Sequence, residues 1–246
     1  MLLAVDIGNT NTKFAVFDGD DLIYRTSIPT PRGQAADDIA NFLTVNFDQK
    51  FKSAIVCSVV PELNQTVSSA IGSTFEVDCR IVTNSDDFGI EIRYEPLEDA
   101  GTDRLVNVFS AVEKYGAPVI VCSFGTATTI DAVDGERVLL GGVIAPGLHT
   151  LSKALHLTTS RLPEVSIEFP DRTIQNTTVE CLRSGIVIGY VEMVDGLIHR
   201  ISSELGVDSK LVVTGGNASL VAEHSAYKMT VETDLLVDGL ANLSIR

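Results

Sequence analysis

The hydrophobic positions of the chain form short runs near its beginning and recur at helical spacing further on. Apolar or alternating segments at 2–6, 14–17 and 22–25 are separated by Gly-Asn and Gly-Asp turn signals, which predicts an antiparallel meander of three strands. A helix is expected over 35–47, then a buried strand over 53–56. Further helices are expected from Pro61, which suits a first helical turn, and over 103–114.

A second series of strands follows at 119–122, 128–132 and 137–140. The longest helical pattern covers 178–205, where apolar residues recur every three or four positions, and Gly206 is the expected C-terminal cap. A strand at 211–213 and a closing helix over 237–245 complete the pattern.

The second half of the chain repeats the opening of the first. The segments AVDIGNTNTKFAVFDGDDLI and IVCSFGTATTIDAVDGERVL share a strand, a glycine turn with hydroxyl side chains, a second strand and an acidic hairpin. Gly125 lies 117 residues after Gly8, a period far longer than the roughly 20–50 residues of solenoid repeats. The sequence therefore predicts two related α/β lobes, 1–115 and 116–246.

Composition restricts the class of protein. The chain has 246 residues, 45% of them hydrophobic, so it can bury a core without disulfides. We find no apolar run of the roughly 18–20 residues that cross a bilayer and no basic leader, so we expect a cytoplasmic protein without a membrane partner. The net charge of −15 disfavours nucleic-acid partners and makes basic residues beside glycine turns notable.

The cysteines and histidines give no sign of a metal or redox site. No CxxC spacing is present, and we expect the cysteines to be buried, reduced thiols. No histidine is assigned to catalysis, because none has metal-ligand spacing. The residues concerned are Cys57, Cys79, Cys122, Cys181, His149, His156, His199 and His224.

The first hairpin turn, DIGNTNTK, combines a carboxylate, a glycine, small polar side chains and a lysine. Glycine allows close backbone approach to a phosphate, and lysine neutralises its charge. Asp6 is a candidate Mg²⁺ ligand, since Mg²⁺ is typically bound by one or two carboxylates plus phosphate oxygens. An ordinary hairpin is the alternative. The candidate ATP-binding residues here are Asp6, Gly8, Asn9, Thr10 and Lys13.

Two further small-residue turns follow later in the chain. The second turn repeats the first with Gly125, Thr126 and Ala127, and a third contains Gly215 and Gly216 before an expected helix, where an anion or the ribose and adenine would fit. Neither GxxxxGK[ST] nor GxGxxG is present, so a P-loop enzyme or a dinucleotide-binding oxidoreductase is not supported.

These motifs together resemble a known superfamily. DIGNTNTK, FGTATT and TGG are similar to the two phosphate loops and the adenosine loop of the actin/hexokinase superfamily. Within it, GTDR at 101–104, GGVIAPG at 141–147 and DLLVDGL at 234–240 resemble type III pantothenate kinases. The resemblance implies two duplicated ribonuclease-H-like lobes of the actin-like ATPase fold, with a nucleotide cleft between them.

The resemblance also implies an activity. Members of this family phosphorylate pantothenate with ATP, the first step of coenzyme A biosynthesis, as homodimers with pantothenate at the subunit interface. They use Mg²⁺ with ATP and a monovalent cation, K⁺ or NH₄⁺. The alternative is an impaired or regulatory member that binds nucleotide without turning pantothenate over.

Substrate residues are assigned by the same resemblance. Asp103 would be the general base, and the guanidinium of Arg104 suits the pantothenate carboxylate. Taken alone, Asp103 could merely favour a helix N-terminus while Arg104 makes a surface ion pair. The matching positions for substrate binding are Tyr94, Gly101, Thr102, Asp103, Arg104 and Thr178.

One position departs from the family pattern. Where the second phosphate loop usually carries an acidic residue two positions before the glycine, this chain has Ser123, and the internal repeat places Ser123 opposite Asp6 in the same way. In the family that carboxylate helps to bind the monovalent cation. Serine offers an oxygen without charge, so we expect a weakened cation position there.

Overall fold

The opening strands of the chain form a mixed sheet. In the computed structural model, which describes residues 1–33 and 36–246, the strand order of this sheet is β3-β2-β1-β4-β5. β1, β2 and β3 are antiparallel neighbours, whereas β4 pairs parallel with both β1 and β5. The meander predicted from the sequence is therefore confirmed. The strands are β1 Leu2–Ile7, β2 Asn11–Asp18, β3 Asp21–Pro29, β4 Ser53–Ser58 and β5 Cys79–Ile81.

A second sheet repeats this plan. Its order is β9-β8-β7-β10-β11, with β6 added beside β9. β7, β8 and β9 are antiparallel neighbours, and β10 pairs parallel with β7 and β11. Order and direction match the first sheet strand for strand, so the predicted duplication is confirmed. The strands are β6 Glu91–Ile92, β7 Val119–Phe124, β8 Ala127–Val133, β9 Val138–Pro146, β10 Lys210–Thr214 and β11 Thr230–Val231.

The chain divides into two compact units. Unit 1 comprises 1–90, 94–110 and 234–246, and unit 2 comprises 91–93 and 111–233. Each sheet lies within one unit, whereas the last five residues of helix α3, Thr102–Tyr115, pass from unit 1 into unit 2. The lobes expected at 1–115 and 116–246 stay a prediction.

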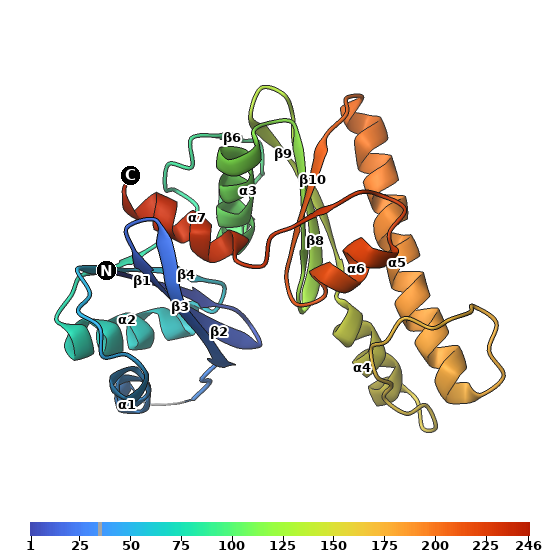
Figure 1. Ribbon diagram of the computed structural model, residues 1–246, viewed down its shortest axis with the longest axis horizontal. Coiled ribbons are helices and arrows are strands. Elements are labelled where there is room, and N and C mark those ends of the chain that lie inside the picture. Colours follow the sequence, from blue (N-terminus) through green and yellow to red (C-terminus); the bar gives the residue numbers. More distant parts are fainter. Residues whose placement is uncertain (34–35) are drawn as a thin grey trace. The chain divides into compact units, whose positions relative to one another are not determined.

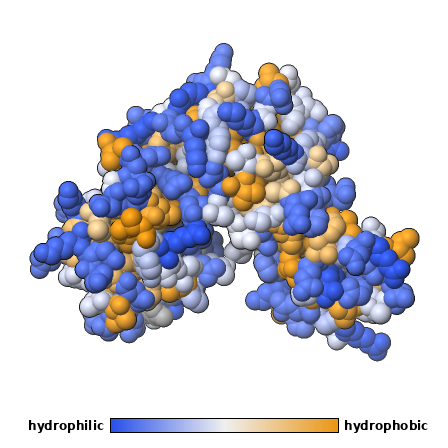
Figure 2. Space-filling view, viewed as in Figure 1, coloured by the Kyte–Doolittle hydropathy of each residue, from blue (hydrophilic) through white to orange (hydrophobic). Residues whose placement is uncertain are grey.

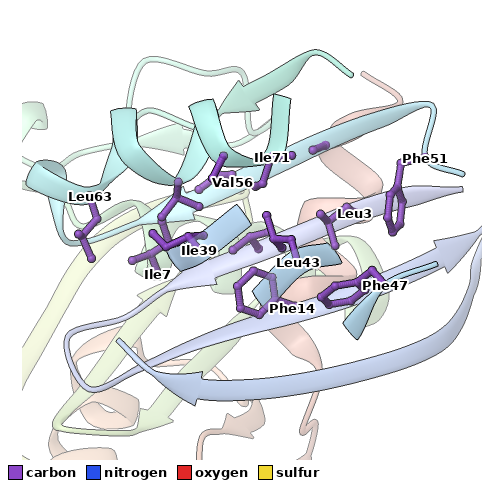
Figure 3. Packing of buried hydrophobic residues seen from close by; sticks show 14 of the residues in the cluster. Leu3, Ile7, Phe14, Ile39, Leu43, Phe47, Phe51, Val56, Leu63 and Ile71 are labelled. Atoms are coloured by element: carbon purple, nitrogen blue, oxygen red, sulfur yellow. The ribbon is translucent and has the colours of Figure 1, made fainter. Parts of the chain in front are cut away.

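Helices cover both faces of the first sheet. α1, Ala36–Asn46, and α2, Pro61–Phe75, pack on one face, where alternate residues of β1 meet apolar helix positions (Figure 3). α7, Leu235–Ser244, packs on β1 and β4 from the opposite face (Figure 1). Ala35, the expected first residue of α1, lies outside the described residues. The labelled core includes Leu3, Ile7, Phe14, Leu43, Phe47 and Ile71.

Unit 2 has its own core beside its sheet. It is built with α4, Leu148–Thr158, α5, Thr178–Leu205, and α6, Ala218–His224. The predicted limits of α5 are confirmed, and Gly206 caps it with φ 66° while its N–H donates to the Ser202 carbonyl. Helix α4 was not predicted from the sequence, and neither was a short 3-10 turn of unit 1, Leu97–Asp99.

The cysteine prediction is only partly right. Cys57 and Cys122 are buried thiols, but Cys79 is half-buried and Cys181 is exposed near the beginning of α5. All four are free cysteines. Cys57 and Cys122 are buried because β4 lies between β1 and β5, and β7 lies between β8 and β10, inside each sheet.

Most of the visible surface is hydrophilic in both units (Figure 2). Exposed large apolar residues occur on α4 and around the start of α5, among them Leu157 and Ile174. Across 1–33 and 36–246, no helix is both long enough and apolar enough to span a membrane.

Candidate active site

The first hairpin turn places a carboxylate and a lysine side by side. Asp6, near the end of β1, is the register partner of Lys13 on β2, and Lys13 Nζ lies 3.3 Å from Asp6 Oδ2. The Asp6 side chain is 9% exposed and that of Lys13 is 52% exposed. Burial raises the pKa of the Asp6 carboxyl, Lys13 lowers it in part, and the charge of Asp103 raises it further.

The turn itself is tight and open to solvent. The Gly8 N–H donates to the Asn11 carbonyl at 3.0 Å, and a Cβ at Gly8 would lie 3.0 Å from that oxygen. Asn9 and Thr10, at the tip, are exposed. The backbone can therefore approach a ligand here without side-chain obstruction from residue 8.

The N-terminus of α3 holds the second carboxylate of unit 1. Asp103 Oδ1 accepts a hydrogen bond from the Arg104 N–H at 2.8 Å, and a Cβ at Gly101 would lie 2.7 Å from Asp103 Oδ1. Burial raises the pKa of Asp103, whereas the Arg104 N–H, the Arg104 charge and Lys13 lower it. Lys13 therefore lowers the pKa of both Asp6 and Asp103, and the charge of Asp103 raises that of Asp6, so the three side chains interact electrostatically.

Thr102 anchors this helix start to the first sheet. Its hydroxyl donates to the Ser58 carbonyl at 3.0 Å and receives a weak hydrogen bond from the Cys57 thiol at 3.5 Å. Cys57 is the register partner of Asp6 on β4. Burial raises the pKa of Cys57, so its thiol stays neutral beside the carboxylates. Sequence reasoning missed Cys57, because register with Asp6 is visible only in the sheet.

Arg104 and Tyr94 form one contact. Arg104 Nη1 donates to the Tyr94 hydroxyl at 3.3 Å, and its guanidinium carbon lies 5.2 Å from the centroid of the Tyr94 ring. Arg104 is only 7% exposed. The sequence-predicted pair is therefore brought together within unit 1, with the guanidinium held by an aromatic neighbour.

The second hairpin has the same strand pairing but lacks the Asp–Lys pair beside the turn. Ser123 is the register partner of Thr129, in the place where the first hairpin pairs Asp6 with Lys13. The turn is one residue shorter, since the Gly125 N–H donates to the Ala127 carbonyl, at 3.0 Å. A carboxylate and an ammonium in unit 1 thus correspond to two hydroxyls in unit 2.

The third turn packs directly on the end of β7. Gly215 has φ +98°, and a Cβ there would lie 2.6 Å from the Phe124 carbonyl oxygen. A Cβ at Gly147 would lie 2.1 Å from the Gly125 carbonyl oxygen. Unit 2 therefore brings the predicted residues around Gly125 and Gly215 together and requires Gly147, which sequence reasoning had not singled out as a close contact.

Thr178 begins α5 on the border of a pocket of about 900 Å³ within unit 2. Thr177 caps the helix by accepting from the Glu180 N–H at 3.3 Å. The lining residues include aliphatic ones of α4 and α5 and the polar residues 175–178. Cys181 and Tyr190 also line the pocket.

The predicted residues therefore fall into two groups by unit. Unit 1 holds the first turn with Asp6, Gly8 and Lys13, together with Tyr94 and 101–104. Unit 2 holds Ser123, the turn at 125–127, the turn at 215–216 and Thr178.

A family model of type III pantothenate kinases matches residues 2–200 of the chain. The chain belongs to the type III pantothenate kinase family. A type III pantothenate kinase of Thermomicrobium roseum is 39% identical over an alignment of 246 positions, which covers 98% of this chain and 95% of the relative. A type III pantothenate kinase of Rhodospirillum rubrum is 39% identical over 247 positions, which cover 98% of this chain and 96% of the relative.

Solved structures extend the likeness to the fold. A Campylobacter jejuni protein assigned to the Baf family of transcriptional activators superposes with a TM-score of 0.64 at 19% identity, covering 98% of this chain and 96% of that one. An inorganic polyphosphate/ATP-glucomannokinase from an Arthrobacter species superposes with a TM-score of 0.50 at 13% identity, covering 99% of this chain and 98% of that one. This type III pantothenate kinase thus has the actin-like fold expected from its motifs.

Proposed function

We propose that this chain transfers the γ-phosphoryl group of ATP to the primary hydroxyl of pantothenate, giving 4′-phosphopantothenate and ADP, the first step of coenzyme A biosynthesis. Family membership supports the reaction, and the observation that carries the assignment of residues is the grouping of Asp6, Lys13 and Asp103 in unit 1. Phosphoryl transfer requires mainly positioning and charge stabilisation, which these groups can supply.

Asp103 is the proposed general base. As the new O–P bond forms and the bond from the γ-phosphorus to its bridging oxygen breaks, the hydroxyl proton passes to the Asp103 carboxylate and ADP leaves with the electron pair. Burial supports this role, because a carboxylate with a raised pKa is a better proton acceptor than a solvated one.

Arg104 and Tyr94 are proposed to bind the pantothenate carboxylate. A guanidinium can hold two carboxylate oxygens at once, and the Tyr94 contact fixes its orientation. Gly101, Thr102 and Thr178 are proposed as further substrate contacts, with Thr102 also tying α3 to β4 through Ser58.

The glycine turns are proposed to bind ATP. Gly8, Asn9, Thr10 and Lys13 would contact phosphate oxygens, as would the counterparts Gly125, Thr126 and Ala127, while Gly215 and Gly216 would contact the nucleoside. Backbone N–H groups in such turns are suitable donors for phosphate.

Asp6 is proposed to hold the Mg²⁺ that accompanies ATP. A buried carboxylate beside a phosphate-binding turn fits a hard cation that keeps several waters, and a cation would offset the cost of its ionisation. Bound Mg²⁺ neutralises charge on phosphate oxygens.

A K⁺ or NH₄⁺ ion is proposed near Ser123, where the hydroxyls of Ser123 and Thr129 are neutral oxygen donors. We also propose a cytoplasmic homodimer.

The test is an assay of purified protein with ATP, Mg²⁺, K⁺ and pantothenate in which ADP and 4′-phosphopantothenate are measured together. We expect equal amounts of the two products, both dependent on pantothenate. Nucleotide binding without turnover would contradict the proposal in favour of a regulatory member, and turnover with another alcohol alone would contradict the substrate. The variant Lys52→Ala, which changes an exposed residue of unit 1, serves as a control and should form both products as the wild type does.

A further inference from the structure

The loop that follows β3 is fastened to the first hairpin turn. The Thr30 N–H donates to the Thr10 carbonyl at 2.9 Å, and the Thr30 hydroxyl donates to the Gly8 carbonyl at 2.6 Å. The buried Thr12 hydroxyl donates to Thr30 Oγ1 at 3.3 Å. These three bonds fix the start of the loop against the turn proposed to bind phosphate.

Arg32 extends from this loop across the tip of the turn. Its N–H donates to the Thr30 carbonyl at 2.8 Å, and its Nη2 donates to Asn9 Oδ1 at 3.1 Å. Both Arg32 and Asn9 are exposed. Within 1–33 and 36–246, no carboxylate lies within ion-pair distance of the Arg32 guanidinium.

We propose that Arg32 binds the β- or γ-phosphate of the nucleotide, as a second cation beside Lys13, an assignment that rests on the proposed function. A guanidinium held by a neutral amide keeps its full charge and most of its donors for an anion, and its planar fork matches two phosphate oxygens. In a chain of net charge −15, a cation held at this turn would also offset general repulsion of the polyphosphate.

The second unit supplies no fixed charge at the matching place. There Gly147 takes the position of Thr30, with its N–H donating to the Thr126 carbonyl at 3.1 Å. Two residues further on is His149 rather than an arginine, and Thr129 stands in the place of Lys13. In this proposal the positive side chains that face the terminal phosphates, beside the Mg²⁺, come from the first turn and are Lys13 and Arg32.

Binding of ATP, ADP and AMP, measured by calorimetry without pantothenate, tests this assignment. Arg32→Ala is expected to weaken the binding of ATP and ADP by about tenfold, because a charged hydrogen bond to a terminal phosphate is lost. The binding of AMP should weaken by less than about twofold. Arg32→Lys, which keeps the charge without the fork, should recover about half of that loss on a logarithmic scale. In turnover, Arg32→Ala should raise KM for ATP more than it lowers kcat.

Lys52→Ala is the matched control, since it removes the same charge beside Met1, at the opposite end of β1 from the turn. It should change none of the three affinities by more than about twofold. Equal losses for ATP, ADP and AMP in Arg32→Ala, or no loss, would overturn the inference. Wild-type protein that binds nucleotide but does not phosphorylate pantothenate would overturn the proposed function alone, and protein that binds no nucleotide would overturn both.

Discussion

At the scale of single residues, the chemistry proposed for unit 1 depends on a buried carboxylate, Asp6, and a half-buried one, Asp103, that both interact with Lys13. Burial raises the pKa of both Asp6 and Asp103, and Lys13 acts in the opposite direction on each. Carboxylates whose ionised form is disfavoured by desolvation are frequent at functional sites.

The pH dependence of turnover follows from the raised pKa of Asp103. As the proposed general base, Asp103 must be ionised, so a raised pKa means that protonation, and loss of kcat, begins at a higher pH than for a solvated aspartate. We expect kcat to fall as the pH is lowered through this range. Asp103→Asn should lower kcat by roughly 10²–10⁴-fold and remove this acidic limb, as measured by pH–rate profiles.

The contrasting variant is Cys57→Ser, which keeps a polar neighbour for Thr102 and leaves the carboxylates in place. It should retain the acidic limb. An Asp103→Asn enzyme with a wild-type profile would show that another group accepts the proton.

Sequence reasoning found the candidate reactive residues more readily than the residues that hold them in place. Asp6 was singled out because a carboxylate beside a glycine turn and a lysine indicates phosphate chemistry, whereas Asp103 and Arg104 were assigned through the resemblance of GTDR to type III pantothenate kinases. Thr30 and Arg32 were not, although Arg32 precedes a glycine and is basic in an acidic chain. Their contacts join segments about twenty residues apart, which only the paired strands bring together.

At the scale of elements, the two hairpins differ at the matched pair that is Asp6 and Lys13 in the first and Ser123 and Thr129 in the second. Ser123→Asp would place a carboxylate where the first hairpin has Asp6, but opposite Thr129 rather than a lysine. We expect it to lower the K⁺ concentration for half-maximal rate several-fold, because a charge offsets the desolvation of the cation.

Thr129→Lys is the opposing variant, since it adds an ammonium at the same place and should raise the K⁺ requirement. Both are measured as rate against K⁺ concentration at constant ionic strength. If Ser123→Asp changed neither the cation response nor the rate, the cation would not be bound at this position.

Substitutions of two glycines test tight packing and helix propensity separately. Gly147→Ala would place a Cβ 2.1 Å from the Gly125 carbonyl oxygen, so the second turn must shift, at a cost of about 2 kcal/mol or more. Gly196 is exposed in α5, and a Cβ there would meet nothing within 4 Å, so Gly196→Ala should stabilise the protein by roughly 0.5–1 kcal/mol. Urea unfolding measures both, and equal effects of the two substitutions would contradict the packing argument.

The elements found from the sequence are those with strong periodicity. The limits of α5 and the positions of the long strands along the chain were predicted from apolar spacing, because a buried face imposes that spacing. The two- and three-residue strands β5, β6 and β11 were missed, since they are too short for a pattern. β9 was predicted only to residue 140, because its second half alternates half-buried and exposed positions around glycines.

At the scale of the whole molecule, sequence order and spatial grouping differ at the C-terminus. The repeat correctly predicted two sheets of one plan, but it could not show that α7, which follows unit 2 in the chain, packs on β1 and β4 of unit 1. A Cβ at Gly239 would lie 2.9 Å from Val106 Cγ1, so α7 also lies tightly against α3. Such long-range packing leaves no local pattern.

This arrangement predicts that a change at the C-terminus destabilises the N-terminal sheet. Leu240 in α7 is fully buried, and Leu240→Ala should cost about 2–5 kcal/mol through lost burial and the cavity left behind. In hydrogen exchange, β1 and β4 should lose protection while α5, whose core lies in unit 2, keeps it. Ile245→Ala, at a position 81% exposed, should change stability by less than about 0.5 kcal/mol. Loss of protection confined to α7 itself would mean that unit 1 folds without its last helix, contrary to the contacts of α7 with β1 and β4.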